Sequence, residues 1–402
     1  MKAITGITLI DGIKNKPEKN AVILVNEEGK IDDCGKRDEV EIPEKVEEID
    51  FANRTVLPGL IDSHVHLCLK TAADPISTLI EESDARTALT ALKNAQKLLA
   101  SGITTARDLG GKNYISLDIR DVIKSGEKIG PHILGSGRIL AMTGGHCWQI
   151  AEEINGETEA RRGARKQIKK GADQIKVMAT GGIMTEGVEP GAPQLTEDEM
   201  RGAIEEAHKA DRKTAAHAQG LEGIKNAIRA GIDSIEHGVF LDEEAVNMMR
   251  NNGVFLVPTR AAIHLILDKG EKAGIPAYMI EKSNSIIDEH LKNFRMALSE
   301  GVRIALGTDA GSTFNEPGNM SLEIKLMVEM GMSPMQAIKS ATANSAKLLG
   351  IDQEAGTISP GKRADLLVLK DNPINDIENI EKVHAVFLQG EQVDLDLLRS
   401  KL

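Results

Sequence analysis

LPGLIDSHVHL, residues 57–67, is the stretch on which the interpretation of the whole sequence depends. Its apolar residues predict a buried β-strand, and His64 and His66 lie at the end of that strand. Side chains two residues apart in a strand point to the same side, so both imidazoles would leave one face together. Two nitrogens held by a rigid strand are a suitable start for a metal site. The alternative is a strand that contains two polar residues by coincidence, and the rest of the chain decides between these readings.

The sequence after residue 57 alternates between short apolar segments and longer segments with helical periodicity. This alternation requires parallel strands joined by helical crossovers, and eight such units are the number in a closed (β/α)8 barrel. An open doubly wound sheet is the competing fold, but no G-x-G-x-x-G follows the first strand. Strands are predicted at 56–66, 104–108, 132–136, 174–179, 214–217, 234–237, 254–257 and 303–307. Helices are predicted at 76–100, 115–124, 158–170, 197–210, 221–230, 242–251, 276–300, 321–331 and 334–349.

Both ends of the chain differ from this middle part in their pattern of apolar and polar residues. Residues 1–56 contain short apolar or alternating segments and a turn signal, NEEGK, with no helix-length periodicity. Residues 351–402 return to short strands around a Pro-Gly turn at 360–361. We therefore predict an α/β protein with a TIM-like barrel over 57–350. The segments 1–56 and 351–402 together are expected to form one small β-sandwich domain.

The composition excludes several classes of protein. The 402 residues are 41% hydrophobic but only 2% aromatic, so the core is expected to consist of aliphatic residues and methionine. The net charge of −12 argues against binding to nucleic acid. The three cysteines are widely spaced, and neither a signal peptide nor an apolar run of 18 residues is present. These features predict a cytoplasmic protein without membrane contact.

Polar side chains gather at the C-terminal ends of the predicted strands, the edge at which (β/α)8 barrels have their active sites. Each of these residues alone could be a satisfied structural residue. Six of them at one edge favour a common site. They are His64 and His66 in the first strand, Lys176 in the fourth, His217 in the fifth, His237 in the sixth and Asp309 after the eighth.

These residues and the motifs around them resemble the amidohydrolase superfamily, in particular its branch of imidazolonepropionase-related hydrolases and cytoplasmic prolidases. The motifs are LPGLIDSHVHL, the lysine of IKVMATGG, HAQG, IEHG, GTDAG and the tail GTISPGKRADLLVL, which together cover almost the whole chain. The resemblance implies a site for two divalent metal ions, most simply Zn²⁺, although iron, manganese or cobalt could use the same ligands. It assigns His64, His66 and Asp309 to one ion, and His217 and His237 to the other. It also implies that Lys176 bridges both ions as an Nζ-carboxylate derived from carbon dioxide.

The chemistry of a buried lysine is compatible with that modification. Burial lowers the pKa of a lysine, and the neutral amine can react with carbon dioxide to give an anion that two cations would attract. The alternative is that Lys176 extends to solvent or pairs with an acid. The implied reaction is hydrolysis by a metal-bridging hydroxide, with Asp309 taking the proton and passing it to the leaving group. A catalytic pair of Cys147 with His146 is not expected, because adjacent residues rarely adopt that geometry.

Three further residues are candidates for substrate binding. His146, in the MTGGHCW loop, is suggested by the prolidase-like branch to hold a carboxylate or carbonyl oxygen of the substrate; the alternative is a structural loop cap. Arg260 follows the seventh strand and could bind a carboxylate bidentately, or form a salt bridge at the barrel rim. Gly182, next to Gly181, is expected to line the pocket.

Three functions remain open from the sequence. The leading hypothesis is a binuclear metal-dependent amidohydrolase for a small substrate with a free carboxylate: a dipeptide, an Xaa-Pro-like substrate or an N-acyl amino acid. The second is a cyclic amide hydrolase or deaminase of the imidazolonepropionase type; Lys176 weighs against it, because those relatives generally use one metal. The third is a non-catalytic metal-binding protein on the same fold. The resemblance also suggests a homo-oligomer.

Overall fold

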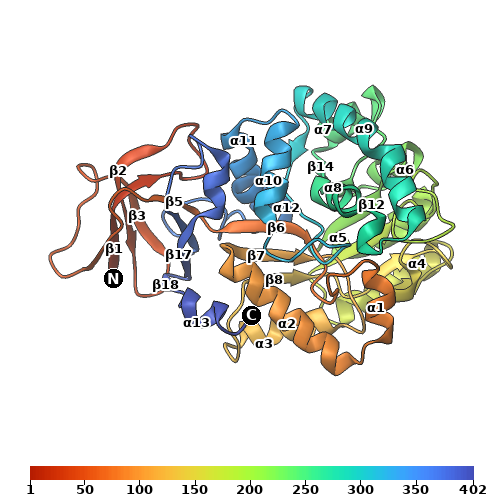
Figure 1. Ribbon diagram of the computed structural model, residues 1–402, viewed down its shortest axis with the longest axis horizontal. Helices are drawn as coiled ribbons and strands as arrows, with labels where there is room; N and C mark the ends of the chain where they lie inside the picture. Colours follow the sequence, from red (N-terminus) through yellow and green to blue (C-terminus); the bar gives the residue numbers. More distant parts are fainter.

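Eight strands form a barrel that makes up the larger part of the molecule in the computed structural model, which describes residues 1–402. Figure 1 shows helices around these strands. Every predicted barrel strand has a counterpart, and neighbouring strands pair in parallel. The strands are β6 (Leu60–Val65), β7 (Ile103–Asp108), β8 (His132–Gly135), β11 (Gln174–Met178), β12 (Lys213–Ala218), β13 (Ser234–His237), β14 (Phe255–Val257) and β15 (Arg303–Ile304).

Backbone hydrogen bonds close the ring between the two groups of paired strands. Asp173 N–H donates to the Gly135 carbonyl at 2.8 Å and joins the start of β11 to β8. Asp309 N–H donates to the His64 carbonyl at 2.8 Å and joins the segment after β15 to β6. The (β/α)8 barrel predicted from the alternation of strands and helices is therefore confirmed.

Helices cover the outside of the barrel and follow the predicted positions closely. They are α1 (Pro75–Glu81), α2 (Asp84–Ala100), α3 (Ile115–Lys124), α4 (Glu157–Lys169), α5 (Glu197–Lys209), α6 (Leu221–Arg229), α7 (Glu243–Asn252), α8 (Arg260–Lys269), α9 (Ala277–Ser299), α10 (Met320–Glu329), α11 (Pro334–Lys339) and α12 (Ser345–Leu349). None of them combines the length and the apolar character that a membrane crossing requires.

The predicted strand at 56–66 is in fact two strands. β5 (Thr55–Pro58) pairs with the sheet of the chain termini, and only β6 enters the barrel. Gly59 lies between them, and a Cβ at this position would come within 2.1 Å of Thr104 Oγ1. A glycine is therefore required where the chain passes from one sheet to the other.

Two predicted helices are interrupted, and one helix of the barrel was not predicted. The helix expected at 76–100 is α1 and α2, because Ser83 starts a new helix by accepting a hydrogen bond from Arg86 N–H. The helix expected at 334–349 contains a π-helical turn at Ser340–Asn344. The unpredicted helix is α8, which begins directly after β14 with Thr259 in the left-handed region, φ 49°.

Both ends of the chain contribute to one mixed sheet beside the barrel, at the left of Figure 1. Alternating apolar residues on its strands pack together, so the sheet has a core of its own. This confirms the small β-sandwich-like unit expected from both termini. Its strands are β1 (Lys2–Leu9), β2 (Glu18–Val25), β3 (Ile31–Lys36), β4 (Glu47–Asp50), β5, β16 (Leu366–Leu369), β17 (Val383–Leu388) and β18 (Glu391–Gln392). A short helix, α13 (Leu395–Arg399), ends the chain against α2.

Two short strands that were not predicted from the sequence, β9 (Ile139–Ala141) and β10 (Ala151–Glu153), extend the sheet beyond β11, in the order β10, β9, β11. β9 pairs in parallel with both β10 and β11. They fix the two ends of the intervening segment, which contains His146. A loop held at both ends in this way can place a side chain over the barrel mouth.

Candidate active site

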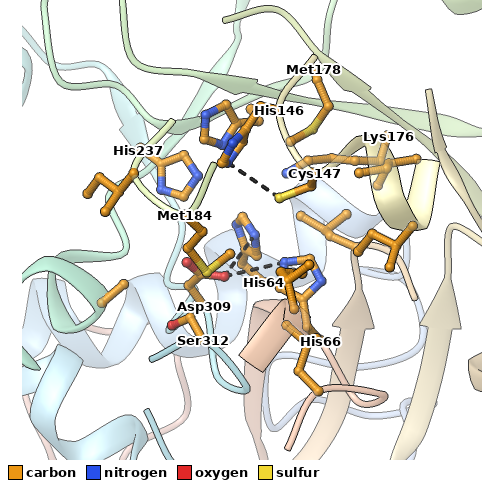
Figure 2. Close-up of a pocket in the computed structure, with 18 of the residues that line it drawn as sticks. His64, His66, His146, Cys147, Lys176, Met178, Met184, His237, Asp309 and Ser312 are labelled. Carbon is orange, nitrogen blue, oxygen red and sulfur yellow. Dashed lines mark hydrogen bonds and ion pairs between the residues drawn. The ribbon is translucent and has the colours of Figure 1, made fainter. Parts of the chain in front are cut away.

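One cavity at the C-terminal end of the barrel strands contains all six residues predicted for the metal site, and His146 with them. Figure 2 shows His64, His66 and Asp309 grouped together, with His237, Lys176 and His146 around them. Strand ends supply nearly all of these side chains, so their positions are fixed by the hydrogen bonding of the barrel itself.

His64, His66 and Asp309 form a group suited to a metal ion. One ligand atom from each lies within 4.8 Å of the others, and Asp309 Oδ1 lies 3.5 Å from His64 Nε2 and 3.4 Å from His66 Nε2. His64 Nδ1 donates to Glu236 Oε2 at 2.8 Å, and His66 Nδ1 donates to the Gly110 carbonyl at 2.9 Å. Both Nε2 atoms therefore keep a free lone pair on the inner side. This is a metal-binding arrangement.

A buried ion pair supports His64 through Glu236, and it was not predicted from the sequence. Glu236 Oε1 accepts from Arg107 Nη2 at 2.7 Å, and neither side chain is exposed to solvent. The Arg107 guanidinium also donates to the Ser63 carbonyl and to Ser234 Oγ. Glu236 thus accepts from both Arg107 and His64, and this arrangement places the His64 proton on Nδ1.

His217 and His237 face each other, with ring centres 4.5 Å apart. His217 Nε2 donates to the Gly181 carbonyl at 3.0 Å, which leaves Nδ1 as the free nitrogen. His237 Nδ1 lies 2.6 Å from Thr259 Oγ1, and the Thr259 hydroxyl donates to the Pro258 carbonyl at 2.8 Å. Thr259 Oγ1 therefore accepts the Nδ1 proton, and His237 keeps a free Nε2.

Burial keeps three of the four imidazoles neutral. It lowers the pKa of His64, His217 and His237 well below the ordinary value for histidine, and neighbouring positive charges add to the effect. Burial also acts on His66, but the hydrogen bond and charge of Asp309 outweigh it and raise the pKa of His66. Neutral imidazoles are the form that binds metal ions.

Lys176 lies inside β11 and is almost fully buried, at 2% exposure. Burial lowers its pKa to about 8, although the nearby carboxylate of Glu236 acts in the opposite direction. The neutral amine is thus much more accessible near neutral pH than in an ordinary lysine. The alternative of a lysine extended to solvent does not apply.

The backbone is strained at two of these positions. His237 and Asp309 have φ values of 73° and 60°, in the left-handed region that residues with a Cβ rarely adopt. Asp62 stabilises the second turn, because its carboxylate accepts from Thr308 N–H at 3.0 Å and from Thr308 Oγ1 at 2.7 Å. Strain that the surrounding structure holds in place is a common feature of functional sites.

His146 also forms a hydrogen bond with a threonine hydroxyl, but here the imidazole accepts the hydrogen, whereas His237 donates it. Thr185 Oγ1 accepts from Cys147 N–H at 3.0 Å and lies 2.9 Å from His146 Nδ1. His146 Nδ1 is the one acceptor within hydrogen-bond distance of the Thr185 hydroxyl hydrogen, so we assign the imidazole proton to Nε2. Burial and the charge of Lys282 lower the pKa of His146 to about 3. His146 is therefore a neutral side chain with an N–H donor in the cavity.

Cys147 and His146 are paired, contrary to the expectation for adjacent residues. Cys147 Sγ lies 3.5 Å from His146 Nε2 because Cys147 takes a left-handed backbone conformation, φ 56°. Burial raises the pKa of the Cys147 thiol to about 12. The sulfur is thus a neutral thiol in the cavity wall, not a nucleophile prepared by the imidazole.

The other two candidates for substrate binding lie differently from the expectation. Arg260 is not among the cavity-lining residues. Its guanidinium donates to the Ile287 carbonyl at 2.8 Å, and its backbone N–H donates to the Glu323 carboxylate. Arg260 was predicted from its residue type and its position after the seventh strand, and the direction of its side chain was not visible in the sequence. Gly182 lies directly against His146, and a Cβ there would come within 2.3 Å of His146 Nε2.

Aliphatic and methionine side chains form the rest of the cavity wall. Ile263 and Ile266 come from α8, and Ile183 and Met184 come from the loop after β11. No aromatic ring other than the imidazoles lines the cavity. The site thus joins a polar floor at the strand ends to an apolar upper wall.

The amidohydrolase family matches this chain over residues 55–393. Ochratoxinase of Aspergillus niger is 33% identical over 364 residues, which are 82% of this chain and 73% of that protein. A crystal structure of a Xaa-Pro dipeptidase with bound methionine has a TM-score of 0.90 and 35% identity, covering 98% of this chain and 99% of the other. A prolidase complexed with N-methylphosphonate-L-proline has a TM-score of 0.89 and 28% identity, covering 98% and 99%. With its (β/α)8 barrel and its metal-binding strand ends, the chain belongs to the amidohydrolase family of metal-dependent hydrolases that act on C–N bonds.

Proposed function

We propose that this protein is a binuclear hydrolase that cleaves the amide bond of a small substrate with a free carboxylate. Dipeptides, Xaa-Pro-like substrates and N-acyl amino acids are the expected classes. The observation that carries the proposal is the orientation of four imidazoles. His64, His66, His217 and His237 each donate one ring proton outward and present the other nitrogen to the cavity that holds Lys176 and Asp309.

These residues divide into two sets of ligands. His64, His66 and Asp309 would hold one divalent cation, His217 Nδ1 and His237 Nε2 would hold the other, and Lys176 would bridge the two. When bound, such a pair of ions, which we expect to be Zn²⁺, supplies Lewis acidity and lowers the pKa of water. The fit rests on the donor set, because the cavity-facing ring nitrogens of His64, His66, His217 and His237 are unprotonated in this hydrogen-bond arrangement.

Lys176 is proposed to carry a carboxylate on Nζ. Its neutral amine would form a bond to the carbon of carbon dioxide and release one proton, giving an anion in place of a cation. The lowered pKa of Lys176 and its burial beside the histidines support this step. A bare ammonium in the same position would repel bound cations.

Asp309 and His146 are proposed to act on the substrate itself. Asp309 would accept a proton from the attacking water and pass it to the leaving nitrogen. His146 would donate its Nε2–H to a carbonyl or carboxylate oxygen of the substrate. The short contacts of Asp309 with His64 and His66, and the Thr185 partner of His146, support these roles.

The apolar wall favours a substrate with an aliphatic side chain. Ile183, Met184, Ile263 and Ile266 offer apolar surface next to the polar floor. The chain is similar to a dipeptidase with bound methionine and to a prolidase with a proline phosphonate, which supports substrates of dipeptide size. Arg260 is turned away, so we assign the carboxylate contact to His146 and the metal site rather than to an arginine.

The test is metal analysis combined with an activity screen. We expect about two metal ions per chain and hydrolysis of at least one aliphatic dipeptide or N-acyl amino acid from a broad panel. Asp309→Asn should abolish turnover while the melting temperature stays close to that of the wild type. One metal ion per chain, or no amide hydrolysis across the panel with two ions bound, would contradict the proposal.

Two further expectations remain predictions. A homo-oligomer would appear in light scattering as a multiple of the 43.3 kDa chain mass. Location in the cytoplasm would appear in fractionation of cells that express the protein.

A further inference from the structure

One loop, residues 179–196 between β11 and α5, controls several parts of the site at once. Its Gly181 carbonyl orients His217. Its Thr185 hydroxyl binds His146 and the N–H of Cys147. Gly182 lies against the His146 ring, and Met184 forms part of the apolar wall. Any movement of this loop would therefore displace both imidazoles and the wall together.

Backbone hydrogen bonds fix the base of the loop but not its tip. Gly181 N–H donates to the Ala192 carbonyl at 2.9 Å, and Gln194 N–H donates to the Ala179 carbonyl at 2.9 Å. Between these points, residues 182–190 have no strand or helix to hold them. A segment of this kind depends on side chains from its surroundings.

Lys282, on α9, supplies the missing contacts. Its Nζ donates to the Thr185 carbonyl at 2.7 Å, to the Val188 carbonyl at 2.7 Å and to the Gly182 carbonyl at 3.4 Å. Tyr278, one turn earlier on α9, donates to the Met184 carbonyl at 3.4 Å. Lys282 is only 7% exposed and forms no salt bridge.

The hydrogen-bond capacity of Lys282 decides what it can do. An ammonium has three N–H donors, and three carbonyl oxygens of the loop occupy them. No donor remains for a substrate carboxylate, so Lys282 is not an anion-binding residue for the substrate. Lys282 instead binds the loop through charge-assisted hydrogen bonds, which are stronger than neutral hydrogen bonds.

We propose that Lys282 is a positioning residue for substrate binding. By holding the carbonyls of Gly182, Thr185 and Val188, it places the Thr185 hydroxyl, which in turn directs His146 Nε2–H toward the substrate. This inference rests on the proposed function insofar as His146 contacts substrate. Its effect should fall on KM rather than on kcat, because the contact exists in both the ground state and the transition state.

The first experiment compares Lys282→Met with Lys292→Met. Lys292 lies on the same helix, but its side chain is 72% exposed and pairs only with Glu289. On the best substrate of the panel, Lys282→Met should raise KM about fivefold, the size of one lost hydrogen bond, with kcat within about twofold. Lys292→Met should leave both constants unchanged. An unchanged KM in a folded Lys282→Met protein would overturn the proposal.

A second readout is independent of any activity. Glu186 is exposed at the loop tip and is followed by Gly187, so a glutamyl endopeptidase can report release of the loop from α9. Cleavage after Glu186 should be at least about fivefold faster in Lys282→Met than in wild type or Lys292→Met. Equal cleavage in all three would contradict the role of Lys282 even if no substrate had been found. Failure of the proposed function alone would leave this difference intact.

Whether Lys282 acts through Thr185 can be tested with a variant that carries both substitutions. Thr185→Val removes the contact with His146 but leaves the carbonyl that Lys282 binds. If Lys282 acts through Thr185, the double variant should have the same KM as Thr185→Val within about twofold. Additive effects would show that Lys282 acts elsewhere. Should Lys282→Met not fold, Lys282→Gln keeps two N–H donors, and it should give an intermediate KM and cleavage rate.

Discussion

His237 and His146 are both bound through Nδ1 to a threonine hydroxyl, yet they present opposite groups to the cavity. Thr259 donates its hydrogen to the Pro258 carbonyl and so accepts the proton of His237. Thr185 accepts from Cys147 N–H, and its hydroxyl hydrogen has no acceptor within hydrogen-bond distance other than His146 Nδ1. The second partner of each threonine therefore decides whether the imidazole offers a lone pair or an N–H.

The two histidine–threonine pairs also differ in the structural elements on which they lie. His237 ends β13 and Thr259 precedes α8, so the barrel itself fixes that pair. His146 and Thr185 lie in two loops, and Lys282 holds one of them. A metal ligand tolerates little movement, whereas a substrate contact benefits from a site that can adjust. We therefore expect changes at the first pair to affect metal content and changes at the second pair to affect KM.

The largest difference is expected between His237→Asn and His146→Asn. His237→Asn should lose one of the two metal ions. Its activity should fall by more than about 10–100-fold, the loss that typically follows mutation of a residue that only supports a metal ligand. His146→Asn should keep both ions and raise KM about tenfold. Metal analysis by mass spectrometry with steady-state kinetics measures both effects. Loss of metal in His146→Asn would remove the distinction between the two histidines.

Glu236→Gln tests the partner that fixes His64. The change removes the carboxylate that accepts from His64 Nδ1 and leaves the buried Arg107 without its counter-charge. We expect metal affinity to fall about 10–100-fold and the free energy of unfolding to fall by about 3 kcal/mol. Chelator competition and denaturant unfolding measure the two quantities. The exposed Glu243, which forms no salt bridge, provides the matched control Glu243→Gln. Wild-type metal affinity in Glu236→Gln would contradict the supporting role.

The threonines themselves should show the smallest effects. Thr259→Val should weaken metal binding about tenfold, because the His237 Nδ1–H loses its acceptor. Thr185→Val should leave metal binding unchanged and raise KM about fivefold, because His146 is no longer held in one tautomer and orientation. Isothermal titration of the metal-free variants and steady-state kinetics distinguish the two. The same response in both variants would mean that the threonines have only a common packing role.

The sequence predicted the barrel and the six residues of its floor for a clear reason. Strand ends of a (β/α)8 barrel converge at one edge, so a polar residue at the end of an apolar segment can be placed without coordinates. His217 and His237 were found in this way. The split between β5 and β6 was missed, because apolar residues flank Pro58-Gly59 on both sides and this turn signal was not applied there.

The supporting residues could not be predicted, because only the folded chain brings them together. Arg107 lies in an apolar strand, far in sequence from Glu236, and nothing local marks it as a partner. Lys282 looks like any helical lysine until its three carbonyl partners are seen. Arg260 shows the reverse error, since a suitable side chain in a suitable position points away from the cavity. Direction and pairing are properties of the packed structure.

The measurement that tests this account most directly is the protonation of the ring nitrogens in the metal-loaded protein, by ¹⁵N–¹H NMR of labelled histidine. We predict a proton on Nε2 of His146 and on Nδ1 of His237, assigned with the His146→Asn and His237→Asn variants. A proton on Nδ1 of His146, or a free Nδ1 in His237, would contradict the assignment of one imidazole to substrate and the other to metal.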